Sequence, residues 1–507
     1  MIRAVTAKQS RSIEERAVTE QHVSLAALMD AAGEAVAREV AARVPQGSVV
    51  VLGGTGNNAG DGWVAARLLH GAGRDVCVRS LVAPVCLHGI AREAAESAIA
   101  AGVSWSDTPP SSLDLAEACV VVDALLGVGA HGRLRDPLGA WVDAANASGA
   151  YLLAVDVPTG LDTDSGAVEG SAIHADATVT FTSPKLGLVT FPGAGFAGEV
   201  VVASVGIDPS LAETPDAPEL WTPEEYAQLL PLPAPDAHKN SRGRLLVIAG
   251  SGSYPGAAIL AARGAMRSGA GYVTLAVPAA VVGIAQAHLL AVPVVGFAQG
   301  RGHAFSSAAL EKLLQFARDY DAVVLGPGLT LADGAVVTAR GLVERLEMPL
   351  VIDADGLNAL VDARALLDAR TSPTVLTPHP GELARLLGVS SADVQRARIS
   401  SAAQLATGAT TVVLKGAGTV ISGEGRCAIN TSGSPALATA GTGDVLAGVI
   451  GALLAQGLSP FDAGALGAYL HGRAGEAAAA ALTPMCVTAE DVPGFLSDAV
   501  GELLDLW

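Results

Sequence analysis

A glycine-rich stretch in the first half of the chain carries polar side chains that could hold a ligand. The sequence GGTGNNAGDG (53–62) directly follows the apolar run VVVL. Glycines after a strand let backbone N–H groups and a helix start face an anion such as a dinucleotide phosphate. The carboxamides of Asn57 and Asn58 and the carboxylate of Asp61 add more hydrogen-bonding capacity than a turn needs. The stretch therefore predicts a ligand site, followed by a helix that begins at Trp63.

Two more acidic residues end apolar runs in the same half. Asp123 follows CVVV and precedes a second glycine-rich loop at 127–133, and Asp156 follows YLLAV and precedes Thr159. A single Asp at a strand end usually forms an Asx-turn or caps a helix. Ligands of open parallel sheets, however, bind beyond the carboxyl ends of the strands, where such residues meet. Together with Asn58, these residues therefore predict one oxygen-rich crevice.

A loop of small residues in the second half carries another candidate carboxylate. The sequence ATAGTGD (438–444) runs into the apolar stretch VLAGVIGALLAQG. Successive backbone N–H groups at a helix start can form an anion hole, and Asp444 within it can take a proton from a substrate hydroxyl as a phosphate arrives. The alternative is that Asp444 only caps the helix.

Two loops upstream carry further candidate site residues in this half. KGAGT (415–419) follows TVVL, and PHPGE (378–382) follows TVLT. With the small-residue loop, they resemble the ribokinase-like fold, in which the lysine loop lies beside a nucleotide and an acidic residue lies near its metal. Taken alone, Lys415 could be a solvated strand end and His379 a satisfied turn residue.

The elements that must position these residues follow an α/β pattern. Runs rich in Val, Ile and Leu alternate with Ala-rich helical stretches, which is typical of fully buried parallel strands. The halves share no repeated motif, so we expect two different α/β domains. The expected strands are 49–52, 75–78, 119–122 and 151–155 in the first half, and 244–249, 273–277, 322–325, 350–352, 374–376 and 411–414 in the second.

The composition changes between the two halves. Residues 207–235 are rich in Pro, Asp and Glu, which indicates a linker with one short helix at 223–230. We therefore predict one domain at 1–213, a linker at 214–235, and a second domain at 236–507.

Composition bears on the partners and on the cellular compartment of the protein. The 507 residues include 31 Lys plus Arg and 50 Asp plus Glu, a net charge of −19, so nucleic acid is a poor partner. The five cysteines show no CxxC spacing, as expected of reduced thiols in the cytoplasm. The amino terminus has no continuous apolar stretch, so it does not resemble a secretory signal.

One long segment of the second half is uncharged. Residues 268–300 contain no Asp, Glu, Lys or Arg, as a membrane span would. Pro278, Pro293, Gln286 and His288 interrupt it, so a buried strand followed by a helix is the better interpretation.

The motifs of the first half are similar to those of NAD(P)H-hydrate epimerase domains. GTGNNAGDG, VDALLGVGAHG and AVDVPTG carry the resemblance, which covers most of residues 1–213. It implies a Rossmann-like three-layer domain, a potassium ion among oxygens of Asn58, Asp123 and Thr159, and Asp156 as the acid/base. Ala59 replaces a usual Gly, and the second loop is looser than the usual pattern. The implied substrate contacts are Asn57, Asn58, Ala59, Gly60, Asp61, Gly127, Val128, Gly129, Ala130, His131, Gly132 and Arg133.

The second half resembles the ADP- or ATP-dependent NAD(P)H-hydrate dehydratases. HKNSRG, GPGL, DADGLN, TPHPGE and GTGD carry this resemblance over nearly all of residues 236–500, with HKNSRG departing from the usual HKGxxG. It implies a ribokinase-like domain, Asp444 as the base, and Mg²⁺ with the nucleotide. The implied hydrate contacts are Ala257, Gly328 and His379, and the implied nucleotide contacts are Lys415, Gly416, Ala417, Gly418, Thr419 and Gly443.

In this order, the two halves resemble the bifunctional NAD(P)H-hydrate repair enzymes. The resemblance implies epimerisation of the R and S hydrates of NADH or NADPH, and dehydration of the S hydrate with ADP or ATP. One alternative is a ribokinase-like kinase of a vitamin precursor or sugar; another is a first domain that only binds nucleotides. We expect a cytoplasmic homo-oligomer that acts on small molecules and binds neither nucleic acid nor membranes.

Overall fold

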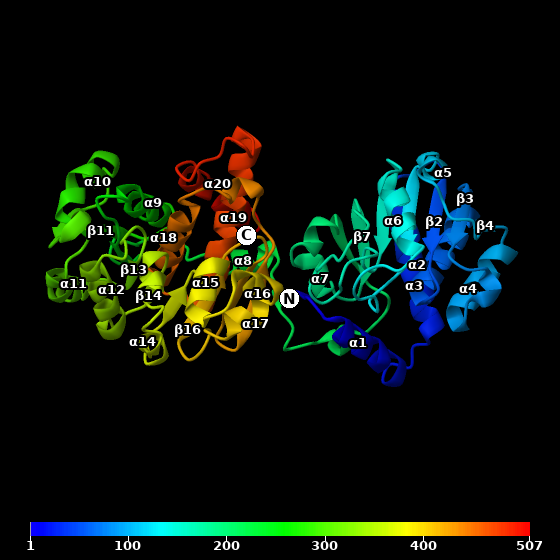
Figure 1. The fold of residues 1–507 in the computed structure, drawn as a ribbon, viewed down its shortest axis with the longest axis horizontal. Helices are drawn as coiled ribbons and strands as arrows, with labels where there is room; N and C mark the ends of the chain where they lie inside the picture. Colours follow the sequence, from blue (N-terminus) through cyan, green and yellow to red (C-terminus); the bar gives the residue numbers. More distant parts are fainter. Residues whose placement is uncertain (1) are drawn as a thin grey trace. The chain divides into compact units, whose positions relative to one another are not determined.

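The computed structural model describes residues 2–507, which form two compact units (Figure 1). The units are Ile2–Pro218 and Glu219–Trp507, so the division falls inside the predicted linker. The short helix expected at 223–230 is present as α8 (Pro223–Ala227), and its residue Tyr226 is buried in the core of the second unit. The second half of the predicted linker is thus an ordered part of the C-terminal unit.

The N-terminal unit is built on a parallel sheet of seven strands in the order β4–β3–β2–β5–β6–β7–β8. The four expected strands are present within one or two residues of their predicted bounds. The strands are β2 (Val49–Gly53), β3 (Val76–Ser80), β4 (Ser104–Ser106), β5 (Val120–Ala124), β6 (Tyr151–Val155), β7 (Ala177–Phe181) and β8 (Glu199–Ala203), and the unit also contains β1 (Ile2–Arg3).

Successive residues of one strand enter different cores, which makes this unit three-layered. Val51 of β2 packs in a core with Trp63, whereas its neighbour Leu52 packs in a second core with Trp141. Side chains alternate across a strand, so helices cover both faces of the sheet. The helices are α1 (Ala7–Thr19), α2 (Leu25–Arg43), α3 (Asn57–Gly71), α4 (Gly89–Ala100), α5 (Ser112–Ala116), α6 (Leu138–Asn146) and α7 (Leu186–Val189).

The start of α3 differs from the sequence prediction. The helix begins at Asn57 instead of Trp63, with Gly56 as its N-cap. A Cβ atom on Gly60 would lie 2.4 Å from the Met29 side chain, and one on Gly62 would lie 2.6 Å from Ala124 Cβ. These glycines therefore allow close packing inside a helix, and the glycine-rich composition does not mark a loop there.

The C-terminal unit contains a larger sheet with the order β9–β18–β17–β16–β15–β14–β13–β10–β11–β12. All six expected strands are present, and they form its parallel centre. The strands are β9 (Glu219–Leu220), β10 (Arg244–Ile248), β11 (Tyr272–Pro278), β12 (Val294–Phe297), β13 (Ala322–Leu325), β14 (Leu350–Ile352), β15 (Thr374–Leu376), β16 (Thr410–Leu414), β17 (Thr419–Gly423) and β18 (Arg426–Asn430).

Beyond the six expected strands, one end of this sheet is antiparallel and was not predicted. β16, β17 and β18 are antiparallel, and β17 and β18 are joined by Glu424 and Gly425, with φ of 55° and 73°. Two consecutive positive φ values are typical of the turn that matches the twist of a tight hairpin. These short strands follow directly after Leu414, so they lack the separating helix that made the other strands recognisable.

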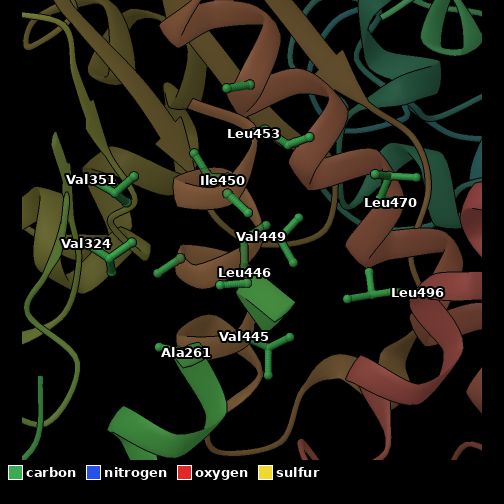
Figure 2. Close-up of a cluster of buried hydrophobic side chains, with 14 of the residues drawn as sticks. Ala261, Val324, Val351, Val445, Leu446, Val449, Ile450, Leu453, Leu470 and Leu496 are labelled. Atoms are coloured by element: carbon green, nitrogen blue, oxygen red, sulfur yellow. The ribbon is translucent and has the colours of Figure 1, made fainter. Parts of the chain in front are cut away.

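Helices cover this sheet, and one of them lies in its core. Every residue of α18 (Thr442–Ala455) from Val445 to Ala455 is buried, as expected for a helix that is apolar all round. Figure 2 shows its side chains among Val324 and Val351 of the sheet and residues of α9, α19 and α20. The other helices are α9 (Pro255–Met266), α10 (Val282–His288), α11 (Leu310–Ala317), α12 (Asp333–Arg345), α13 (Asp355–Asn358), α14 (Ala365–Asp368), α15 (Pro380–Leu387), α16 (Ser391–Arg396), α17 (Arg398–Ala403), α19 (Pro460–Leu482) and α20 (Val492–Leu504).

The uncharged segment 268–300 forms a strand, a helix and a further strand, β11, α10 and β12. Within residues 2–507, none of the helices has the length and apolar composition that crossing a bilayer requires.

Candidate active sites

Three predicted oxygen ligands of the N-terminal unit lie in one hydrogen-bond network. Asp123 is the penultimate residue of β5, and Thr159 follows β6. The Thr159 backbone N–H and hydroxyl each donate to the Asp123 carboxylate, both at 2.7 Å. The Leu126 N–H donates to Thr159 Oγ1 at 3.1 Å, and Asn58 Nδ2 donates to the Leu126 carbonyl at 3.0 Å. Two strand ends and the start of α3 thus bring these residues together.

The burial and charge of this network suit a monovalent cation. Asp123 and Thr159 are each 1% exposed, and burial raises the pKa of Asp123 to about 6. Across residues 2–507, no lysine or arginine forms an ion pair with Asp123. A buried carboxylate without a cationic partner is unfavourable, and a cation beside it would offset that cost. One carboxylate with neutral oxygens is too little charge for a tightly held divalent ion.

The predicted acid/base Asp156 has a lysine partner that sequence reasoning missed. Lys185 Nζ lies 2.6 Å from Asp156 Oδ1, and Thr180 Oγ1 donates to the same oxygen at 3.1 Å. Asp156 directly follows β6 and has a φ of 65°, a conformation that non-glycine residues rarely adopt. Lys185 is the one charged residue between positions 177 and 198. A lone lysine in an apolar stretch could have been recognised from the sequence as the partner of a buried carboxylate.

A cavity of about 80 Å³ lies near this pair, since its wall includes Phe181, whose carbonyl accepts a hydrogen bond from Lys185 Nζ at 3.1 Å. Asn57 and Asp61 of α3 and Glu14 of α1 line it, and most of its remaining wall is apolar. Burial, reinforced by the charge of Asp156, raises the pKa of Asp61 well above its usual range and also that of Glu14. Glu14 is accessible through the cavity although protein atoms surround it. It was not predicted, because its helix is rich in charged residues.

The other residues predicted to hold substrate in this unit are not gathered in one place. Residues 129–133 of the second loop line a separate cleft of about 440 Å³, where His131 Nδ1 lies 2.9 Å from Asp162 Oδ2. Val128 packs in a small apolar cluster, and Gly127 contacts Asn58. Ala59 and Gly60 are buried within α3, so they contribute to packing.

In the C-terminal unit, the side chain of Lys415 points into a cluster of acids. Its Nζ lies 2.7 Å from Asp353 Oδ1 and 3.9 Å from Glu382 Oε2. Asp353 directly follows β14 and accepts a further hydrogen bond from Thr377 Oγ1 at 2.8 Å. Lys415 is therefore not a solvated strand end. The DADGLN and TPHPGE motifs contained Asp353 and Glu382, but no role was predicted for either side chain.

Asp444 lies in the first turn of α18 and does not cap it. The N-cap is Gly441, and no side chain makes a capping bond there. Burial, followed by the negative charge of Asp353, raises the pKa of Asp444 to about 7, while Lys415 opposes the shift. Such a carboxyl group is suited to accept a proton near neutral pH. The alternative interpretation, in which the Asp444 side chain caps the helix, is therefore wrong.

The remaining predicted residues lie around these groups. A Cβ atom on Gly443 would lie 3.2 Å from Lys415 Nζ, and one on Gly328 would lie 3.0 Å from Ala257 Cβ. His379 Nδ1 accepts from the Gly381 N–H at 3.0 Å, so its half-exposed ring caps α15, as the turn alternative predicted.

Arg398 fixes the predicted nucleotide loop and was not predicted. Its Nη2 donates to the carbonyls of Leu414, Lys415 and Gly418 at 3.0–3.2 Å. These bonds hold the backbone on both sides of Gly416 and Ala417, ahead of Thr419, which begins β17. The shape of the loop therefore depends on a side chain of α17.

Comparisons with known proteins agree with these motifs. A family model described as NAD(P)H-hydrate dehydratase matches residues 245–493, and one described as YjeF-related protein N-terminus matches residues 25–187. The chain is 38% identical over 505 residues to the bifunctional NAD(P)H-hydrate repair enzyme Nnr of Moorella thermoacetica, covering 97% of this chain and 95% of that protein. Its identity to the Escherichia coli protein of the same name is 34% over 468 residues, 90% of this chain and 86% of that one.

The chain is also similar to a solved structure. This is the ADP/ATP-dependent NAD(P)H-hydrate dehydratase from Bacillus subtilis, co-crystallised with ATP and Mg²⁺. The sequence identity is 30%, the TM-score is 0.49, and the match covers 56% of this chain and 98% of that one.

Proposed function

Because the chain belongs to the family of bifunctional NAD(P)H-hydrate repair enzymes, we propose that it returns hydrated NADH and NADPH to the intact coenzymes. The N-terminal unit would interconvert the R and S hydrates, and the C-terminal unit would dehydrate the S hydrate with ADP or ATP. The observations that carry the proposal are that each half matches one of the two family models and that each unit holds a lysine–aspartate pair at the carboxyl end of its own parallel sheet.

Epimerisation requires the hydroxyl-bearing ring carbon to lose and regain its substituent. The carbon–oxygen bond breaks with help from the neighbouring ring nitrogen, the oxygen leaves as water after taking a proton, and water returns to the other face. Asp156, held by Lys185 and Thr180, is the proposed acid/base. The largely apolar cavity with Asn57 and Asp61 would orient the ring.

A potassium ion fits the N-terminal unit. Asn58, Asp123 and Thr159 would hold it, because they belong to one hydrogen-bond network in which a buried carboxylate lacks a cationic partner. When bound, such an ion supplies positive charge that orients oxygen atoms of the substrate. Asn58 Nδ2 already donates to Leu126, which leaves the amide oxygen of Asn58 as a possible ligand.

Dehydration in the C-terminal unit would begin with proton removal by Asp444. The substrate oxygen attacks the terminal phosphorus of the nucleotide, the shortened nucleotide leaves, and Asp444 keeps the hydroxyl proton. Phosphate then leaves the ring carbon with the electron pair of the carbon–oxygen bond and takes up the proton that the neighbouring carbon loses, which regenerates the double bond. The N–H groups of residues 441–443 and the loop 415–419 would hold the phosphates.

Magnesium fits this site as a companion of the nucleotide. No group of three or more His, Cys, Asp or Glu residues in the described part of the chain could hold a metal by itself. Magnesium is commonly held by one or two carboxylates and substrate phosphates, so the nucleotide would provide most of its ligands. It would supply charge neutralisation for the phosphates.

One assay tests both activities. Purified protein is given a mixture of R and S hydrates with ADP or ATP, and regenerated NADH or NADPH is measured by its absorbance. Full conversion is expected. Conversion that stops at the share of one epimer would show an inactive N-terminal site, and accumulation of a stable phosphorylated product would indicate a small-molecule kinase instead.

We also propose that the enzyme acts in the cytoplasm as a homo-oligomer. All five cysteines are free, as expected of a reducing compartment. Sedimentation of the purified protein at several concentrations measures its oligomeric state, and a monomer at every concentration would contradict the proposal.

A further inference from the structure

The ammonium group of Lys415 lies beside the start of α18 and does not extend along its own loop. Its partners Asp353 and Glu382 are 1% and 5% exposed, at 2.7 and 3.9 Å from Nζ. On the other side, Nζ lies 3.2 Å from the place that a Cβ atom on Gly443 would occupy. A larger residue than glycine would therefore press on the ammonium group.

Asp353 is held firmly enough to aim this lysine. Thr377 Oγ1 donates to the same carboxylate oxygen that binds Lys415. A Cβ atom on Gly326 would lie 1.8 Å from the Asp353 carbonyl, so the two backbones are in direct contact. The next residue, Ala354, has a φ of 48°. Such strained residues persist where the surrounding structure determines their conformation, and they cluster at functional sites.

We propose that Lys415 is a catalytic residue that stabilises the phosphoryl group during its transfer, and that Asp353 is the positioning residue that directs it. This inference rests on the proposed dehydratase function. Phosphoryl transfer depends on placing fixed positive charge where the transferred oxygens carry negative charge. Lys415 and the N–H groups of residues 441–443 would together contact that group, and Lys415 would keep its protons throughout while Asp444 takes the hydroxyl proton.

The inference differs from the expectation that Lys415 is mainly a nucleotide ligand. A nucleotide ligand contributes equally to the bound state and the transition state, so its loss raises KM. A group that acts on the phosphoryl group in transit contributes to the transition state, so its loss lowers kcat. The two roles therefore separate in a kinetic experiment.

The test compares Lys415→Met, Lys415→Arg and Asp353→Asn with the wild type. Lys312→Met and Asp319→Asn, exposed changes on and just after α11, are matched controls. We expect Lys415→Met to lower kcat on the S hydrate by about 10²–10³-fold at saturating ATP, the cost of removing one fixed donor. ATP affinity measured by calorimetry should change by less than tenfold. Lys415→Arg should recover part of kcat.

The pH dependence of the rate separates positioning from a structural effect. The charged groups that act on Asp444 are Asp353, Asp355, Glu382 and Lys415. Loss of Lys415 should shift the rising limb of the kcat/KM profile to higher pH, and Asp353→Asn should shift it to lower pH. A merely structural role would lower the melting temperature without opposite shifts.

Several outcomes would overturn the inference. One is a Lys415→Met variant with normal kcat and weakened ATP binding, and another is an Asp353→Asn variant with an unchanged rate and pH profile. If Lys415→Met does not fold, Lys415→Arg and Asp353→Asn decide the question by the same two readouts. A wild-type protein that forms no NADH from the S hydrate would instead refute the proposed function.

Discussion

The two units use a buried lysine–aspartate pair in different ways. In the N-terminal unit, Lys185 binds Asp156, the proposed acid/base itself, at 2.6 Å. In the C-terminal unit, Lys415 binds Asp353 at 2.7 Å, and the proposed base Asp444 lies outside the pair. The first arrangement compensates the charge of the reacting carboxylate. The second leaves the base with a pKa of about 7 and places the ammonium group beside the expected phosphate.

Both pairs lie at the same kind of position in the fold. Asp156 and Asp353 each follow the last residue of a parallel strand, and the left-handed φ occurs at Asp156 itself or at Ala354. Ligands of such sheets bind at the carboxyl ends of the strands. The comparison teaches that a shared architecture fixes where a charged pair lies, while the partner of the lysine determines what the pair does.

The largest effect should come from breaking the N-terminal pair. Asp156→Asn should slow epimerisation by about 10²–10⁴-fold, the usual value of an acid/base group, and leave dehydration of the S hydrate unchanged. The two activities separate because the sites lie in different units with different cores. Epimer interconversion followed by NMR measures the rate, and an unchanged rate would remove Asp156 from the mechanism.

The matching change in the C-terminal unit is Asp444→Ala. Dehydratase turnover should fall by at least about 100-fold, while ATP or ADP affinity changes by less than about tenfold. Since Asp444 makes no capping bond, the melting temperature should not fall. A lower melting temperature with near-normal turnover would restore the cap interpretation.

The pH dependence of the dehydratase tests the raised pKa of Asp444 directly. The base must be ionised, so kcat/KM should rise about tenfold per pH unit below about 7 and level off above it. The sign for stability is opposite. The folded protein binds this proton more tightly than the unfolded chain does. The contribution of Asp444 to stability therefore falls as the pH rises from the ordinary pKa of an aspartate towards about 7. Asp444→Asn should remove both dependences, and a rising limb that persists belongs to another group.

The smallest effect should follow exchange of the cation. Replacing potassium by a bulky organic cation should slow the epimerase several-fold and leave dehydration of the S hydrate at its original rate, because Asn58, Asp123 and Thr159 lie in the N-terminal unit alone. Rates in the two salts at equal ionic strength provide the comparison. Equal epimerase rates would argue against a potassium site.

Local sequence patterns predicted the elements whose burial is uniform along the chain. Strands such as β5 and β14 are buried at every residue, so their apolar runs were sufficient. The start of α3 was wrong because glycines that serve packing look like glycines that serve a loop. The acidic and amide residues at strand ends were singled out because parallel strands bring their carboxyl ends together, and their roles as bases and ligands stay predictions.

The partners of these residues could not be predicted in the same way. Asp353 and Lys415 are 62 residues apart in sequence, and Asp156 acts on the pKa of Glu14, which lies on a helix near the amino terminus. Pairing over such distances is set by the stacking of helices on sheets, and no local spacing records it. Sequence reasoning therefore singled out the candidate acids and bases but missed the charged side chains that lie beside them.

The burial of α18 determines how the dehydratase would lose activity. Gly448 packs so closely against α9 that a Cβ atom there would lie 1.9 Å from the Ala261 carbonyl, and Gly264 contacts Val445 in the same way. A helix enclosed on all sides opens only when its whole unit unfolds, so its backbone amides should be among the slowest to exchange hydrogen. Asp444 lies in the first turn of this helix. On heating, catalysis in this unit should therefore be lost together with the unit itself, with no partly opened form that keeps its fold but lacks its base.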